Sequence, residues 1–469
     1  MAPAGRDQDL ARTWAGNDPG GGEKGEPLSH RLGRARPDRR KGKPGMEVKA
    51  PKGTMDILPP LSGRWRRVQE KGVRLFRNFG YREIILPIME HTEIFARSIG
   101  ESTDIVQKEM FTFRDKGGRS LTLRPEATAG VARAFVEHRL DAAGLPQKLY
   151  YQGPMFRHER PQAGRYRQFR QLGVELIGSS QASADAEVVL LCREFFSLLE
   201  VETELIINSV GDEACRPAYV DALSDYLRKN KEKLCEDCRR RAVENPLRVL
   251  DCKVKDCAAV IGKAPDLEAY LCGACRDHFQ EVVSLLQAVG VECRREPRLV
   301  RGLDYYTRTV FEFLNPSLGA QNALAAGGRY DNLIEQLGGK ATPAVGFSIG
   351  MERVMLAEPR LEEEKARGVY VLAIGGEARR QAFVIAQRLR EAGVEADLDH
   401  LDRSPKAQMR EAGREGYPLC VILGEEEMGG GFFTLRDMLR GVQERVPAEE
   451  LLRAVRRRLE EEGSPEGKD

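Results

Sequence analysis

Five arginines lie within the segment from Gly153 to Gly178, at positions 157, 160, 165, 167 and 170. Carboxylate and amide side chains are interspersed among them. A guanidinium group is permanently charged and offers a rigid, bidentate fork of donors that fits carboxylate and phosphate groups. The mixture of charges therefore favours a ligand that carries both signs of charge. The alternative is a solvated hairpin with surface salt bridges.

The alternating pattern that follows predicts the strand that positions this segment. Residues 169–177 alternate between an apolar and a polar face. The apolar face holds Leu172, Val174 and Leu176, and the polar face holds Gln171, Gly173 and Glu175. The proline and glycine of Arg160–Gly164 predict a loop. We therefore expect two antiparallel strands, with Arg157 and Glu159 on the polar face of the first.

Two other segments combine polar side chains with a change of secondary structure. In Leu121–Ala129, strand-like alternation stops at a proline, and Glu126 and Thr128 precede a helical run. Capping of that helix is the alternative role for these two residues. Leu299–Phe313 carries Arg301 next to a glycine, which lets the backbone approach a ligand closely. Both segments are candidates for ligand binding.

A glycine-rich segment and a strand–helix junction follow in the chain. Ala326–Asp331 predicts a turn that leads into a helix, although glycine pairs alone are a weak signal. Pro343–Arg353 predicts a strand, a glycine and the start of a helix, with Arg353 in its first turn. A helix N-terminus and a guanidinium together favour an anion such as phosphate.

Length and composition limit the possible classes of protein. The 469 residues predict two to four domains. The net charge of +2 indicates no overall basic field, so any RNA binding must come from local patches. No apolar run approaches the roughly 20 residues of a membrane span, and we expect no membrane partner. Ten cysteines without a signal peptide favour a reducing, cytoplasmic setting.

The apolar patterns divide the central chain into a domain and an insertion. One domain is predicted over residues 46–210 and 298–360, and it is interrupted at 211–297 by a helical segment that holds most of the cysteines. The insertion contains two Cys-x-x-Cys pairs, Cys235 with Cys238 and Cys272 with Cys275. Their spacing predicts a closed, four-thiolate structural zinc site. Cys252 and Cys257 are further candidates, and reduced thiols without metal are the alternative.

The two ends of the chain differ from each other. Residues 368–463 alternate between strands and helices, which predicts a small α/β domain with a largely parallel sheet. Residues 1–45 lack an apolar pattern and are predicted to be a disordered extension, with an RNA-binding arm as the alternative. Residues 464–469 are predicted to be a disordered tail.

Several of these segments resemble one family. FRHERPQAGRYRQF at 156–169 resembles motif 2 of class II aminoacyl-tRNA synthetases, in the form found in histidyl-tRNA synthetases. RGLDYY at 301–306 is similar to a signature of the same family, and 343–353 resembles class II motif 3. The helix, strand and proline that end at Pro87 resemble motif 1, which builds the dimer interface in that family. The resemblance covers the chain from Met46 onward, apart from the insertion.

This resemblance implies an α/β protein with two main parts. An α+β catalytic domain would be built on an antiparallel sheet, over 46–210 and 298–360, with a separate C-terminal α/β domain that binds the anticodon. The implied activity is ATP-dependent attachment of L-histidine to tRNA(His) through a histidyl-adenylate, with Mg²⁺ accompanying ATP. A cytoplasmic homodimer is implied as well.

The resemblance also implies roles for individual residues. Histidine would be bound by Glu126, Thr128, Arg157, Gln171, Glu175, Arg301, Tyr305, Tyr306 and Tyr330. ATP would be bound by Arg157, Glu159, Arg165, Arg301 and Arg353. Arg301 would be the catalytic residue, at the α-phosphate. The sequence departs from the family at Ala127, where glycine is usual, and at Arg170, where histidine is frequent.

Two other classes of protein share this fold. One is the regulatory subunit of ATP phosphoribosyltransferase, which makes no adenylate, lacks the anticodon domain and loses the motif arginines. The other is an RNA-binding or sensor protein with an inactive synthetase fold. Arginines are present at all four motif positions here, Arg157, Arg165, Arg301 and Arg353, and this favours a catalyst.

Overall fold

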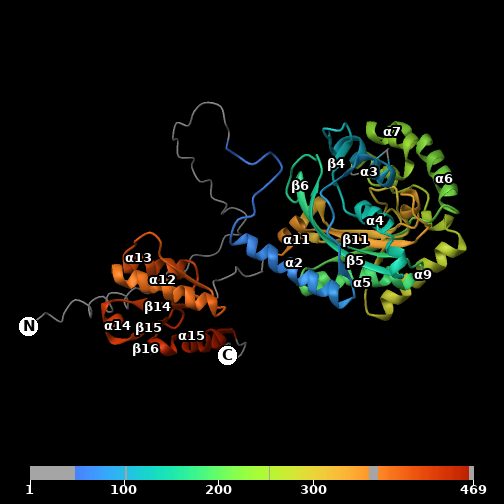
Figure 1. Ribbon diagram of the computed structural model, residues 1–469. Helices are drawn as coiled ribbons and strands as arrows, with labels where there is room; N and C mark the ends of the chain where they lie inside the picture. Colours follow the sequence, from blue (N-terminus) through green and yellow to red (C-terminus); the bar gives the residue numbers. More distant parts are fainter. Residues whose placement is uncertain (1–47, 101–102, 253, 359–367, 464–469) are drawn as a thin grey trace, which may run out of the picture. The chain divides into compact units, whose positions relative to one another are not determined.

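The computed structural model describes residues 48–100, 103–252, 254–358 and 368–463. The predictions for residues 1–45 and 464–469 lie outside these ranges. Two folded units are described, one that ends at residue 358 and one that begins at residue 368 (Figure 1). Within the described residues, no helix is both long and apolar enough to cross a membrane.

An eight-stranded sheet forms the centre of the first unit. Its strands are β1 (Arg82–Glu83), β5 (Gln147–Phe156), β6 (Gln168–Ile177), β7 (Glu204–Ser209), β8 (Arg294–Arg295), β9 (Thr307–Leu314), β10 (Ala323–Arg329) and β11 (Ala344–Gly350). They are ordered β1-β5-β6-β11-β10-β9-β7-β8. The interior pairs are antiparallel, and the edge pairs β1–β5 and β7–β8 are parallel.

The predicted antiparallel hairpin is confirmed as β5 and β6, which pair from Gln147–Ile177 to Phe156–Gln168. The loop is longer than predicted, because β5 ends at Phe156 and β6 begins at Gln168. Arg157 and Glu159 therefore lie in the loop and not on the face of a strand, as the alternation had suggested. The loop holds both side chains by other contacts, described below.

Helices and a second, smaller sheet complete this unit. The helices outside the insertion are α2 (Leu61–Asn78), α3 (Thr92–Ile99), α4 (Thr128–Glu137), α5 (Ala182–Leu198), α10 (Leu333–Gln336) and α11 (Met351–Ala357). The second sheet consists of β2 (Met89–His91), β3 (Phe111–Arg114) and β4 (Ser120–Leu123), in the order β2-β4-β3. Short helical turns lie at Ile105–Glu109, Leu140–Ala143, Lys231–Lys233, Pro246–Val249, Leu267–Tyr270 and Pro316–Gln321.

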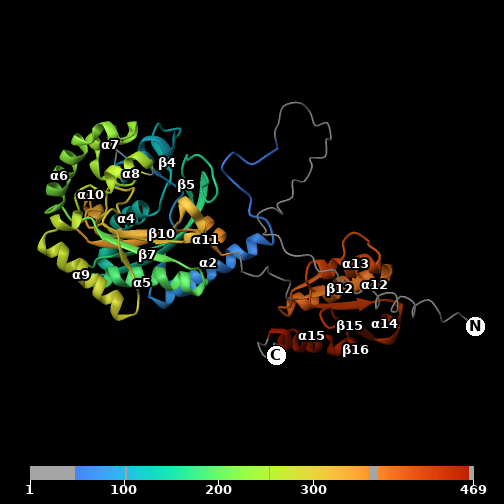
Figure 2. The same ribbon diagram turned by 180° about the vertical axis from the view of Figure 1, so that it is seen from behind.

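The alternation in β6 separates two faces of the large sheet. Leu172, Val174 and Leu176 are buried in a core shared with α2 and α5. Burial of such side chains stabilises a fold by roughly 1.5–3 kcal/mol each. The opposite face of β6 carries Gln171 and Glu175, on the side of the sheet covered by α4. Figures 1 and 2 show α4 and α5 on opposite sides of the sheet.

The predicted insertion is helical but ends earlier than residue 297. Its helices are α6 (Arg216–Lys229), α7 (Glu236–Glu244) and α8 (Lys255–Ile261), followed by α9 (Gly273–Ala288). The apolar face of α9, with Phe279, Val282 and Leu286, is buried in the same core as α5. The strand after it, β8, pairs with β7 in the large sheet. Helix α9 and β8 therefore belong to the layers of the sheet domain.

The second unit is a small α/β domain around its own core. Its strands are β12 (Val369–Ala373), β13 (Ala396–Leu398), β14 (Leu419–Leu423), β15 (Phe432–Asp437) and β16 (Gln443–Pro447). Its helices are α12 (Gly376–Glu391), α13 (Pro405–Arg414), α14 (Glu425–Gly430) and α15 (Leu451–Gly463), with a short turn at Ala448–Glu450. The order β13-β12-β14-β15-β16 is parallel only over its first three strands, because the β15–β16 hairpin adds two antiparallel ones.

Candidate active site

One cavity of about 750 Å³ opens on the polar face of the large sheet. It is lined by segments that lie far apart in the sequence: the start of α4, the β5–β6 loop, β6, the segment before β9, β10 and the β11–α11 junction. Every residue predicted to bind histidine or ATP lies in its wall: Glu126, Thr128, Arg157, Glu159, Arg165, Gln171, Glu175, Arg301, Tyr305, Tyr306, Tyr330 and Arg353.

Glu175 is the most enclosed carboxyl group of this cavity. Only 1% of the residue is exposed. Thr128 Oγ1 donates a hydrogen bond to Oε1 at 2.6 Å, and the Tyr330 hydroxyl donates to Oε2. Burial raises the pKa of Glu175 to about 8 in spite of these donors, because a charged carboxylate loses its solvation there. A further hydrogen bond donated to this carboxyl would lower its pKa and favour the ionised form.

A glycine on the neighbouring strand makes room for this carboxyl. Gly346 of β11 lies directly opposite Glu175 in the antiparallel register. A Cβ atom at position 346 would collide with Glu175 Oε2 and with the Val174 carbonyl oxygen. Position 346 therefore admits no side chain while Glu175 occupies its present place.

Glu126 is bound to the N-terminus of α4. Its carboxylate accepts hydrogen bonds from the backbone N–H groups of Thr128 at 2.6 Å and Ala129 at 2.9 Å. Glu126 therefore caps the helix, which was the alternative to ligand binding that the sequence left open. Burial raises the pKa of Glu126, and the same two backbone donors oppose that shift. Because the residue also lines the cavity, capping fixes the carboxylate where a ligand can reach it.

Three tyrosines form an aromatic wall. The ring centroids of Tyr305 and Tyr306 are 4.7 Å apart, and those of Tyr305 and Tyr330 are 5.6 Å apart. The glycine-rich segment behind them was predicted to be a turn, but Gly327 and Gly328 lie inside β10. A Cβ at Gly328 would come within 2.9 Å of the Tyr306 ring, so the glycine serves close packing and not a turn.

Backbone carbonyls and rings hold the arginines of the site in place. Arg157 Nε donates to the Pro125 carbonyl at 2.9 Å, and its guanidinium lies 5.3 Å from the centre of the Phe169 ring. Arg353 Nη1 donates to the Ala323 carbonyl at 2.7 Å. Burial lowers the pKa of Arg353, with a smaller effect from neighbouring arginines. Fixed arginines of this kind concentrate positive charge for an anionic ligand.

Arg165 and Arg301 are each paired with a carboxylate. Arg165 Nη1 lies 3.2 Å from Glu159 Oε2, and Arg301 Nη1 donates to Glu312. The Arg301 guanidinium also lies 5.9 Å from the centre of the Tyr306 ring. Among the described residues, four buried atoms of this wall find no hydrogen-bond partner: Glu159 Oε2, Arg165 Nε, Arg301 Nε and Gln171 Oε1. Buried polar atoms of this kind are normally satisfied, so they indicate a polar ligand.

The sequence assigned no role to several carboxylates of this wall, including Glu312 and Glu352. Glu312 faces the cavity from β9, and Glu352 faces it from the first turn of α11. Glu352 accepts the backbone N–H of Arg170 at 2.9 Å, and burial raises the pKa of Glu352 to about 7. The signal for Glu312 was its place between the buried Phe311 and Phe313, since a charge within an apolar strand needs a partner.

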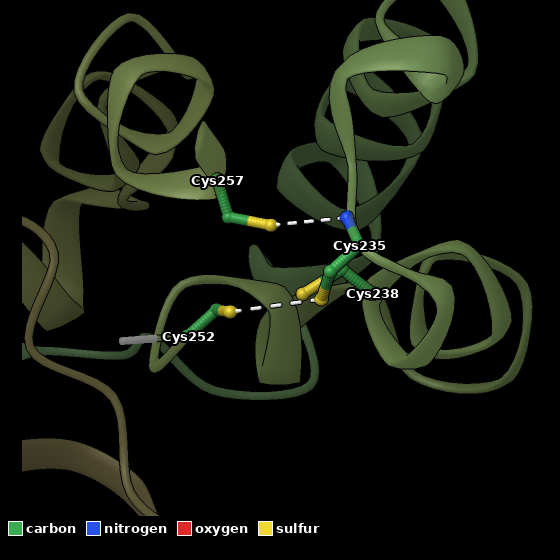
Figure 3. A group of neighbouring side chains, drawn as sticks. All are labelled: Cys235, Cys238, Cys252 and Cys257. Carbon is green, nitrogen blue, oxygen red and sulfur yellow. Dashed lines mark hydrogen bonds between the residues drawn. The ribbon is translucent and has the colours of Figure 1, made fainter. Parts of the chain in front are cut away.

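The cysteines of the insertion form two clusters and not the predicted single four-sulfur set. Cys235 and Cys238 meet Cys252 and Cys257, whose side chains converge in Figure 3. The second predicted pair meets Asp212 and Cys215 instead. The two cysteines of each Cys-x-x-Cys pair lie in the same cluster. The packing of α6, α8 and α9 decides which distant residues join each pair. The spacing of the cysteines does not predict this packing.

Comparison with known proteins relates both units to the same class of enzyme. Residues 53–354 match the family model described as histidyl-tRNA synthetase, and residues 368–458 match the anticodon binding domain. The chain is 47% identical to a histidine–tRNA ligase of Halothermothrix orenii, over 88% of this chain and all of the relative. It is 49% identical to the ligase of Moorella thermoacetica, over 86% of this chain and 96% of the relative.

A solved structure agrees with these relatives. The apo histidyl-tRNA synthetase of S. aureus superposes with a TM-score of 0.74 at 36% identity, over 87% of this chain and all of that chain. An antiparallel sheet with buried arginines and carboxylates around one cavity, followed by an anticodon-binding domain, defines a class II aminoacyl-tRNA synthetase. Within that class, the chain belongs to the histidyl-tRNA synthetase family.

Proposed function

We propose that this protein attaches L-histidine to tRNA(His) in two ATP-dependent steps. The histidine carboxylate attacks the α-phosphate of ATP, which gives histidyl-adenylate and pyrophosphate. The terminal ribose hydroxyl of the tRNA then attacks the activated carbonyl, and AMP leaves. The main support is a single cavity that holds both a buried carboxyl between two hydroxyl donors and a set of fixed arginines. The first feature suits an imidazole and the second suits phosphates.

The imidazole is bound by Glu175 and Tyr306. An imidazole N–H donated to Glu175 adds a third donor to those of Thr128 and Tyr330, which favours the ionised carboxylate. Tyr305 and Tyr330 enclose the ring. An apolar side chain of similar size would leave these buried polar groups unpaired, and sites of this kind reject such analogues strongly. No editing step is then needed.

The charged ends of the amino acid are bound by other groups. Glu126 and Gln171 hold the α-amino group, since the fixed carboxylate of Glu126 supplies a counter-charge and Gln171 Oε1 supplies an acceptor. Thr128 assists as a hydroxyl partner. Arg157 binds near the carboxylate of histidine and the phosphates. Polar groups that are already fixed by the fold lose little entropy when they bind.

MgATP is the second substrate. Arg165 and Arg353 bind its phosphates, and Glu159 takes part in the ATP site as the ion-pair partner that orients Arg165. Arg301 contacts the α-phosphate and the histidine carboxylate at once, which its five donors permit. There it stabilises the charge that develops on the phosphate oxygens as the carboxylate attacks. Before the substrates bind, the hydrogen bond to Glu312 fixes the position of the Arg301 guanidinium.

Three further features belong to this function. The anticodon-binding unit contacts the tRNA. A homodimer forms around the segment after β1, where Ile85 is 87% exposed and Ile88 and Met89 are also exposed, because such apolar groups favour an interface. The setting is cytoplasmic, in agreement with ten cysteines that are free of disulfides.

The predicted structural zinc ion is held by a revised set of ligands. We assign it to Cys235, Cys238, Cys252 and Cys257, with the spacing Cys-x2-Cys-x13-Cys-x4-Cys. Cys235 Sγ and Cys252 Sγ are 4.0 Å apart (Figure 3), close to the roughly 3.8 Å that a tetrahedral zinc–thiolate site requires. Four thiolates close the site, so this ion stabilises the fold and takes no part in catalysis.

Charging of tRNA tests the proposed activity. The purified protein should transfer labelled histidine to a tRNA(His) transcript in the presence of MgATP, and it should transfer none of the other amino acids. Glu175→Gln should abolish the transfer. Glu281→Gln is the matched control, because that carboxyl is exposed on α9 outside the cavity. Absence of charging by the wild-type protein would favour the regulatory or sensor alternatives.

A further inference from the structure

A second group of metal-binding side chains lies where β7 meets the insertion. The ligand atoms of Asp212, Cys215, Cys272 and Cys275 all lie within 4.8 Å of one another. Cys215 Sγ is 3.8 Å from Cys275 Sγ, and Cys272 Sγ is 4.0 Å from Asp212 Oδ1. Sulfur atoms bound to one tetrahedral zinc ion are about 3.8 Å apart. A disulfide would need a far shorter separation between sulfur atoms, and both distances suit a shared ion instead.

The two clusters are built on the same local motif. Leu-Cys-x-x-Cys-Arg occurs at 234–239 and again at 271–276. In both copies the first cysteine directly precedes a helix, α7 or α9. In both, the arginine N–H donates to the carbonyl of the first cysteine, at 2.9 and 3.0 Å. In both, the arginine side chain donates to the leucine carbonyl, at 2.9 and 3.1 Å. Each copy presents two sulfur atoms and requires two more ligands.

The second pair of ligands differs between the copies. The first motif receives Cys252 and Cys257, and the second receives Asp212 and Cys215. Cys215 immediately precedes α6, so the long helices α6 and α9 both direct their N-termini at the second cluster. A helix N-terminus favours the thiolate form that binds metal. Three thiolates and one carboxylate complete a four-ligand set.

We propose that Asp212, Cys215, Cys272 and Cys275 bind a second structural zinc ion, and that this ion positions Tyr306 in the active site. The protein then carries two zinc ions per chain, one for each copy of the motif. The second ion ties the N-termini of α6 and α9 to the end of β7.

Hydrogen bonds connect this second cluster to the aromatic wall of the cavity. Arg216, the residue after Cys215, donates to the carbonyls of Tyr306 and Gly211. Asp212 Oδ2 is paired with Arg308 at 3.4 Å, and the Arg308 N–H donates to Gly211 at 2.7 Å. The cluster therefore contacts the chain just before and just after the start of β9.

The backbone at this point depends on these contacts. Arg308 has φ of 48°, a left-handed conformation that is uncommon for a residue with a side chain. It lies beside the irregular register between β9 and β10. Strained conformations persist only where the surroundings fix them. Loss of the ion should release Arg308 and Arg216 and let Tyr306 shift, so histidine binding should weaken while ATP binding is retained.

Metal content of the full chain, purified without chelator, tests the first part of the proposal. The wild-type protein should hold two zinc ions per chain. Cys215→Ser and Cys252→Ser should hold one each, and Cys293→Ser, outside both clusters, should retain two. One ion or none in the wild-type protein overturns the proposal. So does a Cys215→Ser variant that keeps two. Replacement of zinc by Co²⁺ in the wild-type chain should give the visible absorption of two thiolate sites, whether or not any variant folds.

The positioning role needs a second readout, and this part rests on the proposed histidine activation. Cys215→Ser should raise the KM for histidine about tenfold, the scale for disturbing groups that orient a site, and leave the KM for ATP unchanged. Cys293→Ser, which lies outside both clusters, should change neither value. Equal effects of the two variants, or an equal effect on ATP, would overturn the positioning role. The metal content can be measured in a protein without enzymatic activity. Failure of the proposed function would therefore leave the test of the second zinc ion intact.

Discussion

Replacement of Glu175 by glutamine should remove the loss of stability that this carboxyl causes as pH rises, and it should abolish histidine activation. Glutamine keeps the shape of the side chain and cannot ionise. The native carboxyl has a pKa of about 8, against an ordinary value of 4.5, because it is buried. Between these two pH values the native state binds a proton that the unfolded state lacks. The stability of the wild-type protein therefore falls as pH rises through this window.

The magnitude follows from the size of the shift. The slope is about 1.4 kcal/mol per pH unit, so this group costs the wild-type protein roughly 3–4 kcal/mol between pH 5 and pH 8. The glutamine variant should lack this loss. A changed hydrogen bond with Thr128 or Tyr330 adds a constant offset of about 1–3 kcal/mol. That offset does not depend on pH, so the slope identifies the ionisation.

Urea unfolding at several pH values measures the effect. Trp65 is buried in the same unit and reports its unfolding, and a Trp14→Phe background removes the other tryptophan signal. The difference in unfolding free energy between Glu175→Gln and the parent should grow steadily from pH 5 to pH 8. The exposed control Glu281→Gln should follow the parent. Parallel curves for parent and Glu175→Gln would refute the burial argument.

Three other substitutions test separate parts of the site. Arg301→Ala should slow adenylate formation by roughly two or more orders of magnitude, and it should affect the transfer of histidine from preformed adenylate much less. Rapid-quench measurement of both steps checks this prediction. Equal losses of rate in the two steps would contradict it. Gly346→Ala should abolish histidine binding, because the new Cβ displaces Glu175, and calorimetric titration with histidine measures it. Arg329→Leu should destabilise the fold by about 3–5 kcal/mol, since it leaves Asp185 buried without its charge partner; a smaller loss in urea unfolding would show that His278 alone suffices.

Local periodicity predicted the sheet that carries the site. The spacing of Leu172, Val174 and Leu176 requires that Glu175 lie on the opposite face, because successive strand residues alternate. The segments with arginines and tyrosines could be recognised because their chemistry is specific. They lie in one cavity since β6, β9, β10 and β11 are neighbours in the sheet.

Features that depend on distant packing could not be predicted. Gly327 and Gly328 have the composition of a turn but lie in a strand, where backbone carbonyls of the neighbouring strands and the rings of Phe311 and Tyr306 occupy the space of a side chain. The partners of the two Cys-x-x-Cys pairs are Asp212 and Cys215 before α6, Cys252 in a loop and Cys257 in α8, and no local pattern shows that these segments pack against the pairs. The apolar face of α9 predicts that this helix packs against a core. It does not predict that the core is the one shared with α5.

Pyrophosphate exchange in the absence of tRNA tests most directly that this cavity activates histidine. With the wild-type protein and MgATP, labelled pyrophosphate should enter ATP only when L-histidine is present, and Glu175→Gln should reduce the exchange to background. Two results would contradict the assignment. One is no exchange with histidine by a protein that still binds ATP, and the other is exchange at an equal rate with a different amino acid.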